Sequence, residues 1–300
     1  MFPWKGKVIR KLSRKRLAEF LIESCVFLAG TTSLLFVLLI FTFLLKEGLA
    51  LFQTVSVWNF LLGKNWYPIS SPPRFGALSL ILGSVWVTGG AIFISVPLGV
   101  ASSVYIAEVA PRWLREILKA GIEFLAAIPS VVLGFIGLIT LVPFVQKVFN
   151  LPTGLTALSG SLMLGFMALP TIVSIMEDAL TAVPRSYREG ALAMGATQWQ
   201  AIWRVVLPAA SSGVVAALML GIGRVIGETM AVMMITGNAA QIPTSLLQPV
   251  RTMTATIAAE MGEAVQGSSH YHSLFAIGIV LFVITFLINL TANSFIHKRK

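Results

Sequence analysis

The sequence predicts an all-α membrane protein with six transmembrane helices. The chain of 300 residues is 56% hydrophobic and only 11% charged, with a mean hydropathy of +0.86, whereas a soluble domain has about 25% charged residues. Six stretches are apolar over the roughly 20 residues that a helix needs to cross a bilayer. The loops between them differ in their content of Lys and Arg.

The first span follows a basic segment, residues 1–20, which holds seven Lys and Arg residues. A signal peptide also begins with a basic segment, but its apolar part is only about 7–15 residues long. The apolar run here is longer, so we expect a first helix that is not cleaved. The six predicted spans are 21–45, 78–107, 121–145, 155–177, 209–237 and 273–296.

The distribution of basic residues predicts the orientation. Six spans place the N-terminus, the loops 108–120 and 178–208, and the tail 297–300 on one side of the membrane. This side holds 16 of the 22 Lys and Arg residues, the opposite side holds five, and Arg224 lies inside a span. Cytoplasmic loops are enriched in Lys and Arg, so we expect this side to be cytoplasmic. The net charge of +10 then reflects topology rather than binding to nucleic acid.

Two longer segments are expected on the periplasmic side. Residues 46–76 form the first loop, which contains the aromatic residues Trp58, Trp66 and Tyr67. Aromatic residues of this kind favour the interface between membrane and water. The second, 238–272, is polar and long enough to reach outward or to fold back on the membrane.

No catalytic motif is found in the sequence. It has no Walker phosphate loop, no HExxH and no paired cysteines, and its single Cys25 lies in the first apolar run. The glycines of GIGRVIG (221–227) miss the spacing of a dinucleotide fingerprint by one residue. His270, His272 and His297 flank the last span, and we interpret them as interfacial rather than as metal ligands or a proton relay. We expect a transport subunit that is not an enzyme and binds no cofactor.

The loop 178–208 predicts two short helices joined by a turn. Pro184 is expected to open the first helix at its first position. Gly195 fits the end of this helix, where a positive φ is needed. Thr197 can cap the second helix, and Pro208 is expected to end it and start the fifth span.

The second helix of this loop has an apolar stripe. Trp199, Ile202, Trp203 and Val206 recur at helical spacing. A stripe of this kind on the cytoplasmic face packs either on the lipid surface or into a soluble partner.

The same loop resembles the EAA motif of type I ABC-importer permeases. That motif is E-A-A, three residues, G, nine residues, and I-x-L-P. The matching residues here are Glu189, Gly190, Ala191, Gly195, Val205, Leu207 and Pro208, with Gly190 in place of Ala and Val205 in place of Ile. The resemblance implies the six-helix permease fold over 76–296. It also implies that the loop, above all 184–208, couples the chain to ATPase subunits.

Four further blocks are similar to the permeases of bacterial phosphate importers within that family. These blocks are LAAIPSVVLGFIGL (125–138), AIWRVVLP (201–208), GIGRVIGETMAV (221–232) and GIVLFVITF (278–286). The resemblance implies residence in the bacterial inner membrane and three kinds of partner: a second permease, two ATPase subunits that bind ATP and Mg²⁺, and a periplasmic phosphate-binding protein.

Arg224 and Glu228 carry opposite charges within the fifth span. Residues four apart on a helix share a face, so we expect the two side chains to pair. One interpretation is an ion pair that only fixes helix packing. The other is that Arg224 lines an anion path, because a guanidinium binds phosphate oxygens in a bidentate manner, with Glu228 holding it in place or accepting a proton. The resemblance to phosphate permeases implies the second.

The glycines and prolines of the spans allow two interpretations. Gly223 and Gly227 are expected to let another helix approach closely. Pro97, Pro129 and Pro170 interrupt spans, either for packing or to bend a helix at the path. Two other functions stay open: an ABC permease for a different oxyanion, such as sulfate or molybdate, and a secondary transporter without an ATPase.

Overall fold

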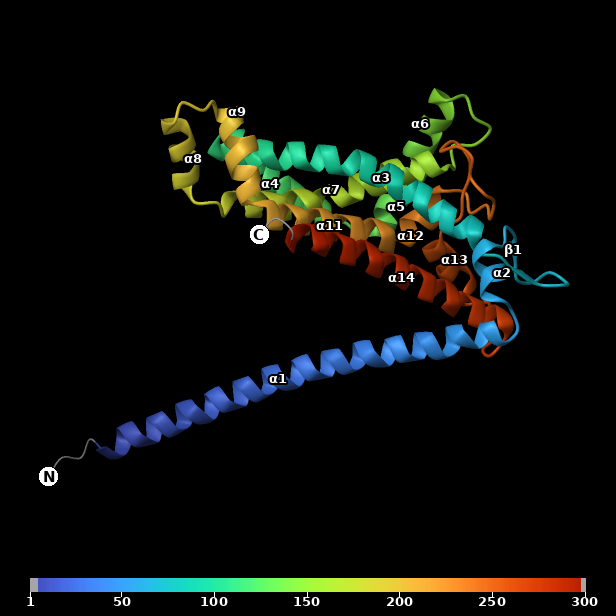
Figure 1. Cartoon of the computed structure of the whole chain (residues 1–300), viewed down its shortest axis with the longest axis horizontal. Coiled ribbons are helices and arrows are strands. Elements are labelled where there is room, and N and C mark those ends of the chain that lie inside the picture. Colours follow the sequence, from blue (N-terminus) through green and yellow to red (C-terminus); the bar gives the residue numbers. More distant parts are fainter. Residues whose placement is uncertain (1–4, 298–300) are drawn as a thin grey trace.

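The computed structural model describes the backbone of residues 5–297 and the side chains of residues 19–291. Apart from α1, its long helices lie side by side and form one elongated bundle (Figure 1). Short elements gather at its two ends. We call the end that carries α8 and α9 the α8 end, and the end that carries β1 and β2 the β1 end. The predicted all-α membrane fold is confirmed.

Five helical segments of the described residues have the length and composition of a membrane span. These segments are Glu19–Gln53, Leu78–Val109, Ser130–Val148, Ala157–Thr181 and Ser269–Thr291. A sixth arises if the bent pair Gln198–Ala209 and Ser211–Gly227 counts as one span, although its two parts meet at an angle of 76°. The count of six predicted spans therefore agrees with the structure, but two of the predicted spans are divided differently.

The third predicted span, 121–145, starts too early. Residues 112–127 form a separate helix, α4 (Arg112–Ala127), none of whose residues is buried. Ile128 and Pro129 are extended, and the membrane helix begins only with α5 (Ser130–Ile139). Proline disfavours the helical conformation of the residue before it, which explains the boundary. The short α6 (Leu141–Val148) continues the span.

The fifth predicted span, 209–237, is also interrupted. Helix α11 (Ser211–Gly227) ends before Glu228, and α12 (Met230–Ile235) follows after a break of two residues. After α12 the chain runs through a segment with little regular structure to α13 (Met253–Glu260).

Helix α7 (Ala157–Thr181) is the centre of the bundle, flanked by α3 (Leu78–Val104) and α11. Ile172 of α7 is fully buried between two glycines. A Cβ built on Gly99 of α3 would lie 2.6 Å from Ile172, and one on Gly221 of α11 would lie 2.3 Å from it. Small residues at these crossings allow the three helices to pack closely, as they do in membrane bundles.

Helix α1 (Lys5–Ala50) diverges from the bundle (Figure 1). It approaches α14 (Ser269–His297) near the β1 end (Figure 1), and the rings of Phe41 and Phe282 lie 5.0 Å apart along the contact between the two helices. The large apolar side chains of α1 between Phe20 and Ile40 are exposed. Helix α1 begins, and α14 ends, on the side of the α8 end (Figure 1).

The β1 end has a small core of its own. Helix α2 (Val57–Leu62) is followed by two short antiparallel strands, β1 (Trp66–Tyr67) and β2 (Arg74–Phe75). Trp66 and Phe75 face each other in register and are buried with Phe60. The predicted outer loop 46–76 is thus mostly folded.

Candidate functional site

The α8–α9 hairpin is built by local residue chemistry. It consists of α8 (Arg185–Ala193) and α9 (Gln198–Ala201). Gly195 has a φ of +84°, as predicted, in the left-handed region that favours glycine. Thr197 caps α9 and forms a capping box with Gln200. Pro184 precedes α8 as its N-cap rather than occupying its first position, a shift of one residue from the prediction.

The second helix of the hairpin divides its predicted apolar stripe between two environments. Ile202 and Val206 are buried in the core of the bundle, whereas Trp199 and Trp203 are 60% and 52% exposed. A π-helical turn over Ile202–Val206 lies between α9 and α10 (Leu207–Ala209). Such turns are frequent at functional sites. Met194, at the end of α8, is also exposed, by 88%.

Pro208 does not end this helix, contrary to the prediction. It lies within α10, and the chain bends at Ala210 instead, where α11 begins one residue later. Proline is tolerated in the first turn of a helix, and Pro208 lies in the first turn of α10.

The residues of the EAA motif lie on α8, at the turn of the hairpin, and where the hairpin joins the bundle. Glu189 and Gly190 are exposed on α8, and Ala191 is half-buried. Gly195 is exposed at the turn. Val205 and Leu207 are half-buried where the hairpin joins the bundle, and Pro208 is exposed.

Arg188 attaches α8 to the bundle. Its Nε donates to Glu108 Oε2 at 2.9 Å and its Nη2 donates to Glu108 Oε1 at 2.5 Å. Its Nη1 and Nη2 also donate to the carbonyl oxygens of Val183 and Leu180. The side chain of Glu108 is 7% exposed. The hydrogen bonds to this carboxylate raise the pKa of Arg188 above its ordinary value, so the guanidinium stays charged.

Glu108 belongs to a second π-helical turn, Tyr105–Val109, which ends α3. Arg115 Nε donates to the carbonyl oxygen of Ile106 at 2.8 Å, and Arg115 also donates to Ala107. Gln198 of α9 donates to the carbonyl oxygen of Glu108 at 3.5 Å. The end of α3 therefore contacts α4 and both helices of the hairpin.

A second ionic contact joins α4 to the end of α7. Lys119 Nζ lies 2.8 Å from Glu177 and 3.0 Å from Asp178. Hydrogen bonds to these two carboxylates raise the pKa of Lys119 far above its ordinary value. A raised lysine pKa stabilises the fold at every pH below the ordinary value, so this contact adds no pH dependence near neutrality.

A groove of about 350 Å³ opens beside the base of the hairpin. Its lining includes Ala179 of α7, Pro184 and Tyr187 of the hairpin, and Gly213 of α11. Tyr187 is 53% exposed. The groove lies between the hairpin and two membrane helices, so a movement of α8 changes contacts with both.

Arg224 and Glu228 do not form the predicted pair. Glu228 is extended, with φ −69° and ψ 131°, because α11 ends at Gly227, so the two residues do not share one helix. Among the residues whose side chains are described, neither takes part in an ion pair. Arg224 Nη1 instead donates to Thr171 Oγ1 of α7 at 3.0 Å. It lies in the last turn of α11, where free carbonyl groups favour a cation.

Glu228 stabilises the break between α11 and α12. Its carboxylate accepts from the backbone N–H of Ala231 at 3.2 Å, and its carbonyl oxygen accepts from Thr254 Oγ1 at 3.0 Å. A carboxylate at the start of a helix is favoured by the free N–H groups there. Glu228 therefore stabilises the start of α12, and its side chain does not hold Arg224 in place.

Gly223 and Gly227 also depart from the prediction. A Cβ built on either would meet no atom within 4 Å. Within the described part of the chain no other helix approaches them, so this face of α11, beside Arg224, is open. The prolines behave differently from one another: Pro97 and Pro170 lie inside α3 and α7, whereas Pro129 starts α5.

The two histidines with described side chains lie close to acidic residues at the β1 end. His270 Nε2 lies 2.9 Å from Glu260, and His272 Nδ1 lies 3.3 Å from Glu47. The side chain of His297 lies outside the described residues. Among the side chains of residues 19–291, no group of three His, Cys, Asp or Glu residues could hold a metal ion.

Sequence reasoning missed Glu108, Arg188 and Thr171. Arg188 directly precedes the EAA motif, and Glu108 is an isolated acid at the end of an apolar run. Both are local signals, but only the folded chain shows that the two residues meet across 80 positions of sequence.

The bundle of spans and the exposed hairpin define a multi-pass membrane protein of the permease class. The family described as "Binding-protein-dependent transport system inner membrane component" matches residues 95–299. This chain belongs to that family.

Similar proteins come from several bacteria. A probable ABC transporter permease protein of Bacillus subtilis, YqgH, is 42% identical over 86% of this chain and 84% of its own length. The phosphate transport system permease protein PstC of Mesorhizobium japonicum is 40% identical over 77% and 76% of the two chains. The PstC protein of Haemophilus influenzae is 34% identical over 95% and 96%.

Two solved structures share the fold. A chain of a bacterial alginate ABC transporter covers 95% of both chains with a TM-score of 0.62 and 16% identity. A chain of the MetNI methionine ABC transporter covers 77% of this chain and all of its own, with a TM-score of 0.58 and 19% identity.

Proposed function

We propose that this chain is a transmembrane permease subunit of an ATP-driven phosphate importer of the bacterial inner membrane. The relatives named as phosphate transport permeases support the substrate. The proposed complex contains a second permease, two ATPase subunits and a periplasmic phosphate-binding protein. ATP and Mg²⁺ bind to the ATPase subunits, and this chain binds no cofactor.

The observation that carries the proposal is the open face of α11 around Arg224. Arg224 is half-buried and has a hydroxyl, not a carboxylate, as its hydrogen-bond partner. Arginine in a membrane helix is costly, by about 2.5–3.5 kcal/mol on insertion scales, and a neutral partner offsets only part of that cost. A guanidinium without a counter-ion retains its attraction for an anion, and its unused N–H groups match phosphate oxygens.

Thr171 and Glu228 have separate roles in this proposal. Thr171 orients the guanidinium from α7, and Glu228 keeps α12 separate from α11 so that the face beside Arg224 stays open. Glu228 lies four positions from Arg224, and its Oε2, which does not contact Ala231, accepts a proton from protonated phosphate. Phosphate crosses between this chain and the second permease along that face.

Coupling runs through the α8–α9 hairpin. In the proposed orientation the α8 end is cytoplasmic, and the exposed Glu189, Gly190 and Gly195 belong to the surface that an ATPase subunit contacts. The tryptophans of α9 extend this surface. When the ATPase subunits close on ATP, the hairpin moves, and the Arg188–Glu108 contact transmits the movement to α3 while Val183 and Leu180 transmit it to α7.

The test is ATP-driven phosphate uptake by vesicles that contain the whole complex. We expect Arg224→Gln to reduce uptake by roughly 10- to 100-fold, the value of a charge-assisted hydrogen bond, with normal assembly and ATPase binding. Glu228→Gln, which keeps an oxygen acceptor for Ala231, is expected to have a smaller effect. Uptake near that of the wild type in Arg224→Gln would exclude Arg224 from the path.

Substrate and energy source are tested in the same vesicles. Sulfate and molybdate are expected not to compete, because protonated phosphate donates a hydrogen bond that sulfate cannot at neutral pH. Uptake without ATP, or purification without an ATPase subunit, would contradict the importer and favour a secondary transporter.

A further inference from the structure

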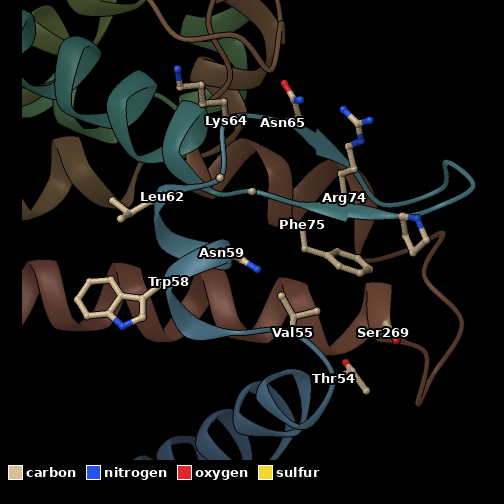
Figure 2. A pocket seen from close by; sticks show the side chains of 13 residues that line it. Thr54, Val55, Trp58, Asn59, Leu62, Lys64, Asn65, Arg74, Phe75 and Ser269 are labelled. Atoms are coloured by element: carbon tan, nitrogen blue, oxygen red, sulfur yellow. The ribbon is translucent and has the colours of Figure 1, made fainter.

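A pocket of about 690 Å³ opens at the β1 end, and Arg224 is not among the residues that line it. It lies between the end of α1, helix α2, the two short strands and the start of α14 (Figure 2). Thr54 follows the first span and Ser269 begins the last. The pocket is therefore level with the ends of the membrane spans rather than within them.

The charge of the pocket is positive. Lys64 and Arg74 line it together with the amide side chains of Asn59 and Asn65, and none of its 13 lining residues is acidic. Neither Lys64 nor Arg74 forms an ion pair or a side-chain hydrogen bond within residues 19–291. Arg251, on the same side of the membrane, is instead bound to Glu260.

The unpaired cations are notable because this side of the membrane has few of them. The five Lys and Arg residues on the side opposite the hairpin are Lys46, Lys64, Arg74, Lys147 and Arg251. Two of these five line one pocket, although the overall distribution depletes basic residues here. Topology does not account for their placement, whereas an anionic ligand does.

The support of the pocket is rigid. Tyr67 and Arg74 face each other in the strand pair, and the Asn65 carbonyl oxygen accepts from Gly76 N–H at 2.9 Å. The buried Trp66 donates to both carboxylate oxygens of Glu260, at 3.1 and 3.0 Å. The strands are thus fixed to α13, so the backbone that carries Lys64 and Arg74 is anchored.

The pocket has a polar rim and an apolar flank. Lys64, Asn65 and Arg74 lie along one rim (Figure 2). Trp58 and Leu62, four residues apart on α2, extend together on the side away from Asn59, and they are 70% and 59% exposed. Lys64 lies on the side of Leu62 and Trp58, whereas Arg74 lies across the pocket from them (Figure 2). Cations and exposed apolar side chains at the end of the spans match the headgroup and the acyl chains of an anionic lipid.

We propose that this pocket binds the phosphate group of an anionic phospholipid. The phosphate contacts Lys64 and Arg74, the glycerol hydroxyls contact Asn59 and Asn65, and the acyl chains lie against Trp58 and Leu62. The bound lipid holds α2 and the strand pair at the membrane surface. Inorganic phosphate presents the same charged group, but it has no apolar part to use the exposed flank of α2.

The test is native mass spectrometry of the full chain released from nanodiscs, with phosphatidylglycerol or phosphatidylcholine as the lipid. We expect one phosphatidylglycerol to be retained in preference to phosphatidylcholine. The double variant Lys64→Gln/Arg74→Gln is expected to weaken this retention by roughly 30-fold, from the loss of two cations near an anionic lipid. Lys147→Gln, on the same side but outside the pocket, is the matched control and is expected to change nothing. Lys64→Arg with Arg74 intact is expected to retain the lipid, which shows that charge rather than a local change of fold is responsible.

Two results would overturn the proposal. One is equal retention of phosphatidylglycerol by the wild type and the double variant. The other is displacement of the lipid from the wild type by millimolar inorganic phosphate, which would assign the pocket to the free anion. Neither result depends on transport, so the proposed import function stands or falls separately.

Discussion

The α8–α9 hairpin and the break between α11 and α12 both interrupt helical sequence, but different forces hold them. The hairpin turns at Gly195, whose φ of +84° suits glycine, and restarts at the Thr197 capping box. The break at Glu228 has neither a proline nor a positive φ. It is held by Thr254 of α13 and by the carboxylate of Glu228 itself.

This difference separates a local turn from a tertiary one. The hairpin is fixed by residues within its own loop and then attached to the bundle by Arg188. The break combines a local contact, from Ala231 N–H to the Glu228 carboxylate, with a tertiary contact from Thr254 of α13. An element that must keep its shape while it moves against a partner benefits from local turn chemistry. The break between α11 and α12 instead depends on the position of α13, because Thr254 of α13 binds the Glu228 carbonyl oxygen.

The largest expected effect concerns the attachment of the hairpin. Arg188→Gln leaves the nearly buried carboxylate of Glu108 without its cation, and breaking such a pair costs about 3–5 kcal/mol. We expect uptake by the complex to fall strongly while ATP hydrolysis continues, because the hairpin still binds the ATPase subunit. The measurement is the ratio of phosphate imported to ATP hydrolysed in the same vesicles.

The double variant Arg188→Glu/Glu108→Arg is the control for this prediction. It restores opposite charges across the same contact, so part of the coupling ratio is expected to return. An unchanged ratio in Arg188→Gln would show that the hairpin transmits force by another route. Arg185→Gln, on an exposed neighbour of the same helix, is expected to leave the ratio unchanged.

The second prediction tests whether the hairpin turn is local. Gly195→Ala places a side chain at positive φ, which costs about 1 kcal/mol, although there is no atom within 4 Å for the new Cβ to meet. Gly190→Ala is the matched control, because Gly190 lies inside α8 and also has open space around it. We expect Gly195→Ala to weaken binding of the ATPase subunit by roughly fivefold and Gly190→Ala to leave it unchanged or strengthen it. Equal effects of the two substitutions would mean that the partner, not the backbone, is sensitive to added side chains.

The same distinction explains what the sequence could predict. Gly195 and Thr197 were predicted correctly because the conformation of a turn depends on the residues within it. The pairing of Arg224 with Glu228 was wrong because a spacing of four is meaningful only on a continuous helix, and the break depends on Thr254, 26 positions away. The early start of the third span has a similar origin, since hydropathy does not show that the apolar residues before Pro129 belong to a separate helix. The partners of Arg188 and Arg224 are contacts between distant helices, which no pattern of single residues contains.

The smallest expected effect concerns the break itself. Thr254→Val removes the hydroxyl that donates to the Glu228 carbonyl oxygen and keeps the shape of the side chain, so it costs about 1 kcal/mol. Thr254→Ser keeps the hydroxyl and is the control. We expect Thr254→Val to slow uptake several-fold with the ATP-coupling ratio unchanged, because the hairpin is far from this contact and the proposed path beside Arg224 is close to it. A fall in the ratio of phosphate imported to ATP hydrolysed would mean instead that the break and the hairpin act as one unit. The difference between a local and a tertiary turn would then not correspond to a difference in function.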